Sequence, residues 1–205
     1  IEVIMVSKNL ENLKKIKQGL IKLGCKESLI SYIASDIMTD EGIDHLISDL
    51  PKSKTFYVVQ SIGMGAGSYK IPNDNIYLPF EQISPELITN ELSLTPAMHR
   101  LILKFIKIFR KQIKDGQKAK LAVITSMSGE RGYHFGATHV AAKHALVGYI
   151  KGIKRELEDE NIDIYDIRPG GIDTGMYDNP YTRKAVEEIA KRDKMWGGKE
   201  PDYAS

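Results

Sequence analysis

Apolar residues follow two different spacings along the chain, and each spacing predicts one kind of element. Short apolar runs, rich in β-branched residues, have the length and composition of buried strands. These runs lie at residues 2–6, 28–35, 54–60, 121–126 and 162–167. Between them, apolar residues recur every three or four positions, which predicts amphipathic helices. The predicted helices cover residues 9–23, 40–50, 85–114 and 137–158, the third with a kink or break at Pro96.

Strands that alternate with helices predict a parallel sheet covered on both faces. We therefore expect a single Rossmann-like α/β domain over residues 1–205, with a doubly wound parallel sheet in three α/β/α layers. Such sheets bind ligands beyond the carboxyl ends of their strands, so the segments that follow the strands should converge there. Residues 61–84, which lack periodicity, predict a long loop. Residues 176–200 predict a helical lid over the site.

Composition points to a small-molecule ligand. Lysine and arginine total 29 against 27 acidic residues, and a net charge of +2 is too small and too evenly spread to indicate a nucleic-acid or membrane surface. No apolar run approaches the roughly 20 residues that span a bilayer. Cys25 is the only cysteine, which excludes an internal disulfide. Without a signal-like start, we expect a cytoplasmic protein.

A glycine-rich segment after the third strand resembles a dinucleotide-binding fingerprint. It contains Gly63, Gly65 and Gly67. The fingerprint requires another glycine where Ser68 stands, and a helix that opens at once. The following residues, SYKIPNDN, cannot open a helix, so the segment predicts a flexible loop beside a pocket instead.

A hydroxyl, an imidazole and an ammonium group mark the candidate chemistry. Ser126 ends a strand at the expected ligand edge, and His139 and Lys143 lie one turn apart on the next helix. Hydride transfer to a carbonyl needs a proton donor and a cation beside a nicotinamide cofactor. Lys143 should drive His139 toward its neutral form. His139 is then an acid, a polar pocket residue or a surface side chain, and Tyr133 in the preceding loop is an alternative phenol. Ser126 orients a carbonyl or only caps its turn.

These intervals resemble the short-chain dehydrogenase/reductase family over the whole chain. Ser126 stands 13 residues before His139, the family's interval from active-site serine to tyrosine, and Lys143 occupies the lysine position. The segment RPGGIDTGM resembles the family's Pro-Gly turn. The segments VSKNLENL and ASDIMTDE resemble the ends of its second and third strands.

The resemblance implies a nicotinamide cofactor whose ribose hydroxyls bind Lys143. Lys8 follows a strand with no acid before it, which favours NADP(H) over NAD(H). Asp36 would face the adenine, with Ile37 beside it. The implied cofactor contacts other than Lys143 are Ser7, Lys8, Asp36, Ile37, Gly63, Pro169, Gly170 and Thr174. No metal site is expected, because His134, His139 and His144 recur every five residues and so lie on different helix faces.

Several departures from the family pattern weigh against a standard site. His139 replaces the tyrosine, and QSIG and SGERG resemble the enoyl-thioester reductase branch, whose tyrosine would stand at Gly136. The family's asparagine has no counterpart near Ser93 to Pro96. The family's first strand with its glycine-rich turn, and its last helix and strand, have no counterpart either. We therefore expect a fold truncated at both ends.

Two functions follow from this pattern. The first is an NAD(P)(H)-dependent oxidoreductase that reduces a carbonyl or an enoyl thioester, or oxidises an alcohol. The alternative is a catalytically inactive family member that serves as a nucleotide-binding structural or regulatory subunit. The missing tyrosine favours the alternative, whereas Ser126, Lys143 and the Pro-Gly turn favour the enzyme. By resemblance, the chain should form a homodimer or homotetramer.

Overall fold

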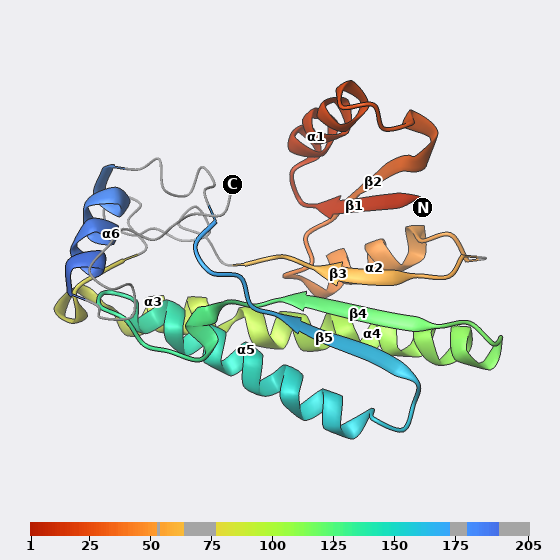
Figure 1. Ribbon diagram of the computed structural model, residues 1–205. Helices are drawn as coiled ribbons and strands as arrows, with labels where there is room; N and C mark the ends of the chain where they lie inside the picture. Colours follow the sequence, from red (N-terminus) through yellow and green to blue (C-terminus); the bar gives the residue numbers. More distant parts are fainter. Residues whose placement is uncertain (53, 64–76, 173–179, 193–205) are drawn as a thin grey trace. The chain divides into compact units, whose positions relative to one another are not determined.

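The computed structural model describes residues 1–52, 54–63, 77–172 and 180–192 (Figure 1). It divides into two compact units. The first comprises Ile1–Lys54 and Ala97–Ile108, and the second comprises Thr55–Pro96 and Phe109–Ser205. The long helix α4, Leu94–Lys114, contributes residues to both units.

The first unit is built on a pair of parallel strands. Its strands and shorter helices are β1 (Val3–Ser7), α1 (Leu10–Lys22), β2 (Ile30–Ala34) and α2 (Asp40–Asp49). Strand β1 pairs with β2 from Val3 opposite Ile30 to Ser7 opposite Ala34. Helix α1 begins where the Asn9 side chain accepts the backbone N–H of Asn12, which satisfies one of the free donors at a helix start. The helix contacts both strands and buries Leu13, whereas Leu10, Ile16 and Leu23 of its apolar stripe are exposed.

The second unit holds a three-stranded parallel sheet. Its strands are β3 (Tyr57–Gln60), β4 (Ala119–Ile124) and β5 (Ile162–Ile167), in that order, and its own helices are α3 (Pro85–Leu92), α5 (Ala137–Glu156) and α6 (Pro180–Arg192). Helix α5 lies against β5 (Figure 1). The core forms where apolar side chains of β4 and α5 are fully buried. These side chains are Leu121, Val123, Leu146 and Ile150. Apolar residues of α6 are buried in a separate cluster with Tyr77.

The predicted helix over residues 85–114 is two helices, and its break lies earlier than predicted. Helix α3 ends at Leu92, and α4 starts at Leu94 after Ser93. Pro96 therefore lies in the first turn of α4 rather than in a helix interior. The first N–H groups of a helix have no partner within it, so a proline there disrupts no hydrogen bond. The break between the two helices lies at Ser93, whose hydroxyl donates to the carbonyl of Asn90.

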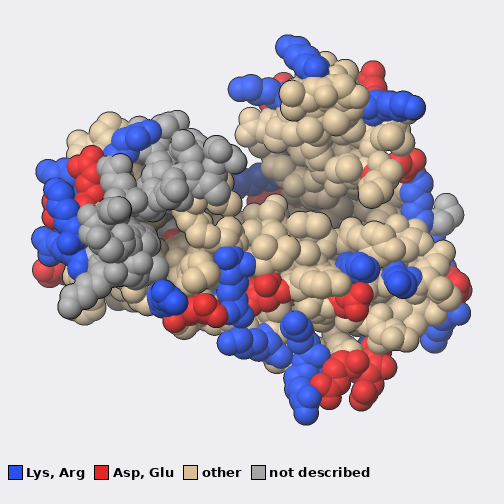
Figure 2. All heavy atoms as spheres, viewed as in Figure 1, with Lys and Arg blue, Asp and Glu red and all other residues tan. Residues whose placement is uncertain are grey.

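Parallel strands flanked by helices make this a Rossmann-like α/β fold, as the apolar pattern predicted. Two predicted features lie partly or wholly outside the described residues. The glycine-rich loop is described only up to Gly63 and again from Tyr77, and the predicted lid is described as α6 alone. Within the described ranges, no helix is both long and apolar enough to cross a membrane. On the face drawn in Figure 2, basic and acidic side chains are intermixed.

Candidate functional site

Ser126 lies two residues after the end of β4, and its hydroxyl organises the turn that comes next. The hydroxyl accepts the backbone N–H of Ser128 at 3.1 Å and lies 3.0 Å from the Ser128 hydroxyl. A short 3-10 turn, Met127–Gly129, results. Gly129 packs so closely on α5 that a Cβ there would lie 2.4 Å from Val147 Cγ2 and 3.0 Å from the Lys143 carbonyl oxygen. The predicted serine and the predicted lysine thus belong to directly packed elements.

Lys143 is a lysine in the protein interior. Only 8% of its surface is exposed, which is unusual for a charged residue without a function or a partner. A Cβ placed on Gly63, just after β3, would lie 3.7 Å from Lys143 Nζ. The amine therefore reaches the end of the neighbouring strand, and the structure brings together Lys143 and Gly63, both predicted cofactor contacts. Burial lowers the Lys143 pKa, and attraction to Glu91 opposes this shift.

Glu91, on α3, is the site residue that the sequence analysis missed. Its surface is 4% exposed, and burial raises its pKa to about 7, with the nearby charge of Lys143 acting in the opposite direction. The sequence signal was present, because Glu91 shares a helical stripe with Leu87, four positions earlier, and Leu94, three positions later. An acid in an apolar stripe is a candidate for function.

His139 is partly buried on α5, one turn before Lys143. Its pKa is lowered to about 4, first by burial and then by the positive charge of Lys143. The expected drive toward the neutral form is confirmed in direction. At pH 7 the imidazole is neutral, so it can donate one hydrogen bond and accept another. It does not carry the extra proton that an imidazolium acid would donate.

Tyr133 fills the space next to Gly136, the position that the resemblance to enoyl-thioester reductases assigns to a tyrosine. A Cβ built on Gly136 would lie 2.2 Å from Cε2 of the Tyr133 ring. The ring also meets Tyr77 edge to face, with centroids 6.0 Å apart, and packs on the apolar cluster formed by Tyr77 and the α6 residues Ala185, Val186 and Ile189. A phenol ring therefore stands beside position 136, although that position itself has no side chain.

The turn after β5 is held against the turn after β4. Met127 donates its backbone N–H to the Pro169 carbonyl at 3.0 Å. The Thr125 hydroxyl donates to Asp166 at 2.5 Å, and Arg168 pairs with both Asp166 and Glu130. The predicted convergence of these two strand ends is confirmed. Gly170 belongs to the same turn, and Thr174 lies outside the described residues.

The first unit carries the remaining predicted cofactor contacts at the ends of β1 and β2. The Ser7 hydroxyl accepts the N–H of Asn9 at 3.3 Å, and Lys8 is exposed. Asp36 is partly exposed and accepts the N–H of Met38 at 3.0 Å. Ile37, with 3% of its surface exposed, is part of the core. In the described part of the chain, no three His, Cys, Asp or Glu side chains gather to hold a metal ion.

The sequence profile of the short chain dehydrogenase family matches residues 1–185. The chain belongs to this family. The resemblance inferred from Ser126, Lys143 and the Pro-Gly turn is thus confirmed at the level of the family.

Individual relatives are distant. The chain is 20% identical to the 3-ketodihydrosphingosine reductase of Bacteroides thetaiotaomicron, over 89% of this chain and 58% of that protein. Among solved structures, it is similar to the 3-ketoacyl-(acyl-carrier-protein) reductase of Brucella melitensis complexed with NADH, with a TM-score of 0.73, 18% identity and coverage of 92% of this chain and 72% of that one.

An alcohol dehydrogenase from the archaeon Thermococcus sibiricus, complexed with 5-hydroxy-NADP, is also similar. Its TM-score is 0.66 at 18% identity, over 85% of this chain and 67% of that one. At such identities the structural similarity shows a shared fold. The chain spans 58% and 53% of the lengths of two curated relatives that it matches.

Proposed function

We propose that this chain is part of a nicotinamide-dependent oxidoreductase that reduces a carbonyl group or an enoyl thioester, or oxidises an alcohol. The observation that carries the proposal is the buried Lys143, packed behind the Ser126 turn and beside Gly63. A family member without chemistry would have little reason to keep an ammonium group in its interior, because burial of a charge is costly.

These residues suit a nicotinamide nucleotide. The Lys143 ammonium has three donors for ribose hydroxyls, and it lies at the strand ends where Rossmann-like folds bind ligands. The family resemblance assigns Pro169 and Gly170 to the nicotinamide half of the cofactor, and Ser7, Lys8 and Asp36 to its adenosine half. We propose NADP(H) rather than NAD(H), because Lys8 is an exposed cation directly after β1. Two of the similar structures are complexes with NADH and with an NADP derivative, which supports the cofactor class.

When bound, the cofactor would supply or accept a hydride at the substrate carbon. In the direction of reduction, this chain must deliver a proton to the substrate oxygen, which Ser126 orients through its hydroxyl. His139 is a weak candidate for this step because its pKa of about 4 leaves it neutral. Tyr133 and a bound water remain candidate donors.

Glu91 provides a further proton source through Lys143. At pH 7 its carboxyl is protonated about half of the time, since its pKa is about 7. We propose that the Lys143 ammonium gives a proton to the substrate oxygen and regains one from Glu91, which becomes a carboxylate. The charge of the pair then falls by one as the hydride arrives, and the alcohol is released neutral.

Several further properties are proposed with the activity. Two relatives are named as reductases of 3-keto compounds, which favours carbonyl reduction of a small molecule. The protein would act in the cytoplasm as a homodimer or homotetramer. Light scattering of the full-length protein tests the assembly, since a monomer mass would contradict it.

Fluorescence titration of the full-length protein with NADPH and NADH tests the function. We expect both to bind, NADPH more tightly, and a screen of 3-keto thioesters, aldehydes, ketones and enoyl thioesters to reveal turnover. Absence of binding to either nucleotide would overturn the proposal. Binding without turnover of any substrate would favour an inactive, nucleotide-binding subunit.

Substitution of Lys143 separates the cofactor role from a role in packing. Lys143→Ala should weaken NADPH binding about tenfold or more, because a charge-assisted hydrogen bond contributes about 1.5–3 kcal/mol. His139→Ala should weaken it less, since a neutral imidazole makes weaker hydrogen bonds. Equal or reversed effects in the same titration would contradict the assignment of the ribose contact to Lys143.

A further inference from the structure

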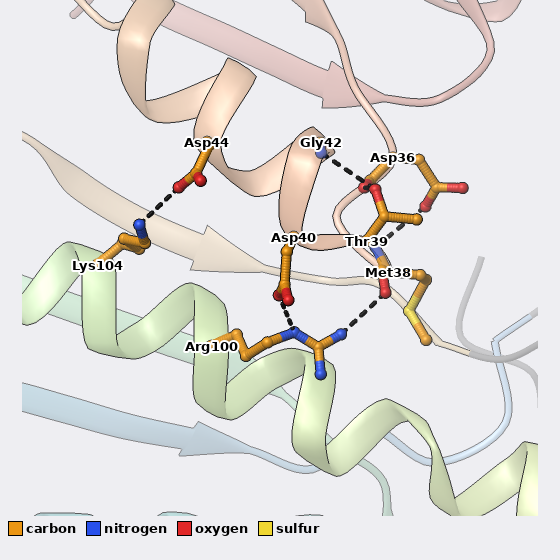
Figure 3. A network of polar contacts seen from close by, with 8 residues as sticks. All are labelled: Asp36, Met38, Thr39, Asp40, Gly42, Asp44, Arg100 and Lys104. Atoms are coloured by element: carbon orange, nitrogen blue, oxygen red, sulfur yellow. Dashed lines mark hydrogen bonds and ion pairs between the residues drawn. The ribbon is translucent and has the colours of Figure 1, made fainter.

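The turn after β2 is built by its own side chains (Figure 3). Thr39 Oγ1 donates to the Asp36 carbonyl oxygen at 3.1 Å and accepts the N–H of Gly42 at 3.0 Å. Asp36 Oδ1 accepts the N–H of Met38 at 3.0 Å, and the Ser35 hydroxyl donates to the Gly42 carbonyl at 2.5 Å. Two of these bonds close the turn on itself, and two tie it to Gly42 in the first turn of α2, so the turn has little freedom of its own.

Gly42 shows how tightly the turn is folded. A Cβ at this position would lie 2.0 Å from the Asp36 carbonyl oxygen and 2.7 Å from its carbonyl carbon. Backbone atoms cannot move away from such a contact as the end of a flexible side chain can. The backbone of Asp36 is therefore pressed against α2, and the turn depends on glycine at position 42.

Arg100 holds this turn from outside, from a helix more than 60 residues later. One guanidinium nitrogen, Nη2, donates to the Met38 carbonyl at 2.9 Å, and Nε lies 2.7 Å from Asp40 Oδ1. The planar guanidinium thus contacts the backbone inside the turn and the first residue of α2 at once. Met38 is the same residue whose N–H binds Asp36.

Lys104, one helical turn after Arg100, also binds an acidic residue of α2, but this residue lies farther from the turn. It pairs with Asp44 Oδ1 at 2.5 Å, in the middle of α2, and makes no contact with the turn in Figure 3. Both cations attach α4 to α2, but only Arg100 also binds the backbone beside Asp36. A comparison of variants at Arg100 and Lys104 therefore distinguishes the attachment of α4 to α2 from control of the turn.

The Asp36 carboxylate uses one oxygen inside the turn. Its other oxygen points away from the network of Figure 3, on a side chain that is partly exposed at the carboxyl end of β2. A carboxylate fixed through one oxygen is suited to accept a hydrogen bond through the other. An amino group of a base is such a donor, whereas a carbonyl oxygen in the same place would be repelled.

We propose that Arg100 is a positioning residue for base recognition: through Met38 and Asp40 it fixes the Asp36 carboxylate to accept a hydrogen bond from the 6-amino group of adenine. This inference rests on the proposed function for the presence of an adenine nucleotide. The family resemblance already assigns Asp36 to the adenine; the inference adds that Arg100, which does not touch the nucleotide, determines how well Asp36 distinguishes one base from another.

The choice between adenine and hypoxanthine tests this role. Hypoxanthine has an oxygen in place of the 6-amino group, so Asp36 loses its donor and faces a negative dipole. The full-length protein should bind NADPH about tenfold or more tightly than its hypoxanthine analogue, the usual effect of one hydrogen bond to a charged group. Asp36→Asn should abolish this preference, because an amide can face either base.

Arg100→Met should reduce the preference at least about threefold, and Arg100→Lys should also reduce it, since an ammonium cannot make both contacts. Lys104→Met is the matched control and should keep the wild-type ratio. A ratio of two affinities within one variant cancels any general loss of binding by a loosened first unit. Circular dichroism and thermal unfolding show which variants are folded.

The outcomes separate the inference from the function on which it rests. ADP and IDP are titrated in parallel, because they lack nicotinamide and test the base alone. A preference for ADP over IDP without binding of NADPH or NADH would overturn the proposed oxidoreductase activity. The role of Arg100 would then be tested by the ratio of the affinities for ADP and IDP in each variant. A wild-type protein that does not distinguish the bases, or that binds neither, overturns the inference. An unchanged ratio in both Arg100 variants, or an equal loss in Lys104→Met, also overturns it.

Discussion

Three ionisable side chains share the interior of the second unit: Glu91, His139 and Lys143. Burial disfavours the charged form of each, and Lys143 is the charged group that acts on the other two. The result is one ammonium between a carboxyl with a raised pKa and an imidazole with a lowered pKa. The pKa of the Glu91 carboxyl, about 7, lies at neutral pH and that of His139, about 4, lies well below it, which is why the carboxyl is the proposed proton reservoir.

Glu91 and His139 should affect stability with opposite signs. The folded-state pKa of Glu91, about 7, exceeds its ordinary 4.5, so the folded protein binds more protons between these values and loses stability as pH rises. The folded-state pKa of His139, about 4, is below its ordinary 6.5, so stability is lost as pH falls through that window. Between pH 4.5 and 6.5 the two contributions oppose each other.

Single substitutions of Glu91 and His139 should therefore change the pH dependence of the free energy of unfolding in opposite directions. Relative to wild type, Glu91→Gln should lose stability as pH falls from 7 to 4.5, and His139→Asn should lose it as pH rises from 4 to 6.5. Each slope should reach at most about 1.4 kcal/mol per pH unit, the value for one proton. Urea unfolding of the three proteins across this range measures the slopes. Parallel curves for all three would show that these groups titrate normally.

At the scale of elements, short polar contacts decide where helices begin and how turns are closed. Ser126, Thr39 and Asn9 each follow a strand or a turn, and each accepts a backbone N–H through its side chain. These contacts are local, so the sequence predicts the residues that follow strands well. The break at Ser93 was harder to predict, because a proline three residues later is a stronger signal in sequence than in structure.

Two glycines of the first unit should respond oppositely to the same substitution. Gly42→Ala forces a methyl group onto the Asp36 carbonyl and should destabilise the protein by about 2 kcal/mol or more. Gly19, exposed within α1, has no atom within 4 Å of an added Cβ. Gly19→Ala should stabilise the protein by about 0.5–1 kcal/mol, because alanine favours the helix. Chemical unfolding checks both, and a neutral Gly42→Ala would contradict the tight turn.

At the scale of the whole molecule, family membership and fold agree although identities are near 20%. What distant relatives share is the alternation of apolar strands and amphipathic helices, and this alternation depends on residue class rather than residue identity. Side chains at the site are freer to differ. That His139 takes the place of the family's tyrosine stays a prediction. That the chain forms one domain stays a prediction.

The sequence alone determined the elements and the local part of the site. Periodicity reports which side of a strand or helix is buried, and the interval from Ser126 to Lys143 lies within one strand, turn and helix. Tertiary structure decided which distant residues meet: Glu91 with Lys143, Tyr133 with position 136, and Arg100 with the Asp36 turn. The physical reason is that such contacts depend on the angle and depth at which helices pack, and the periodicity of the sequence does not reveal either of them.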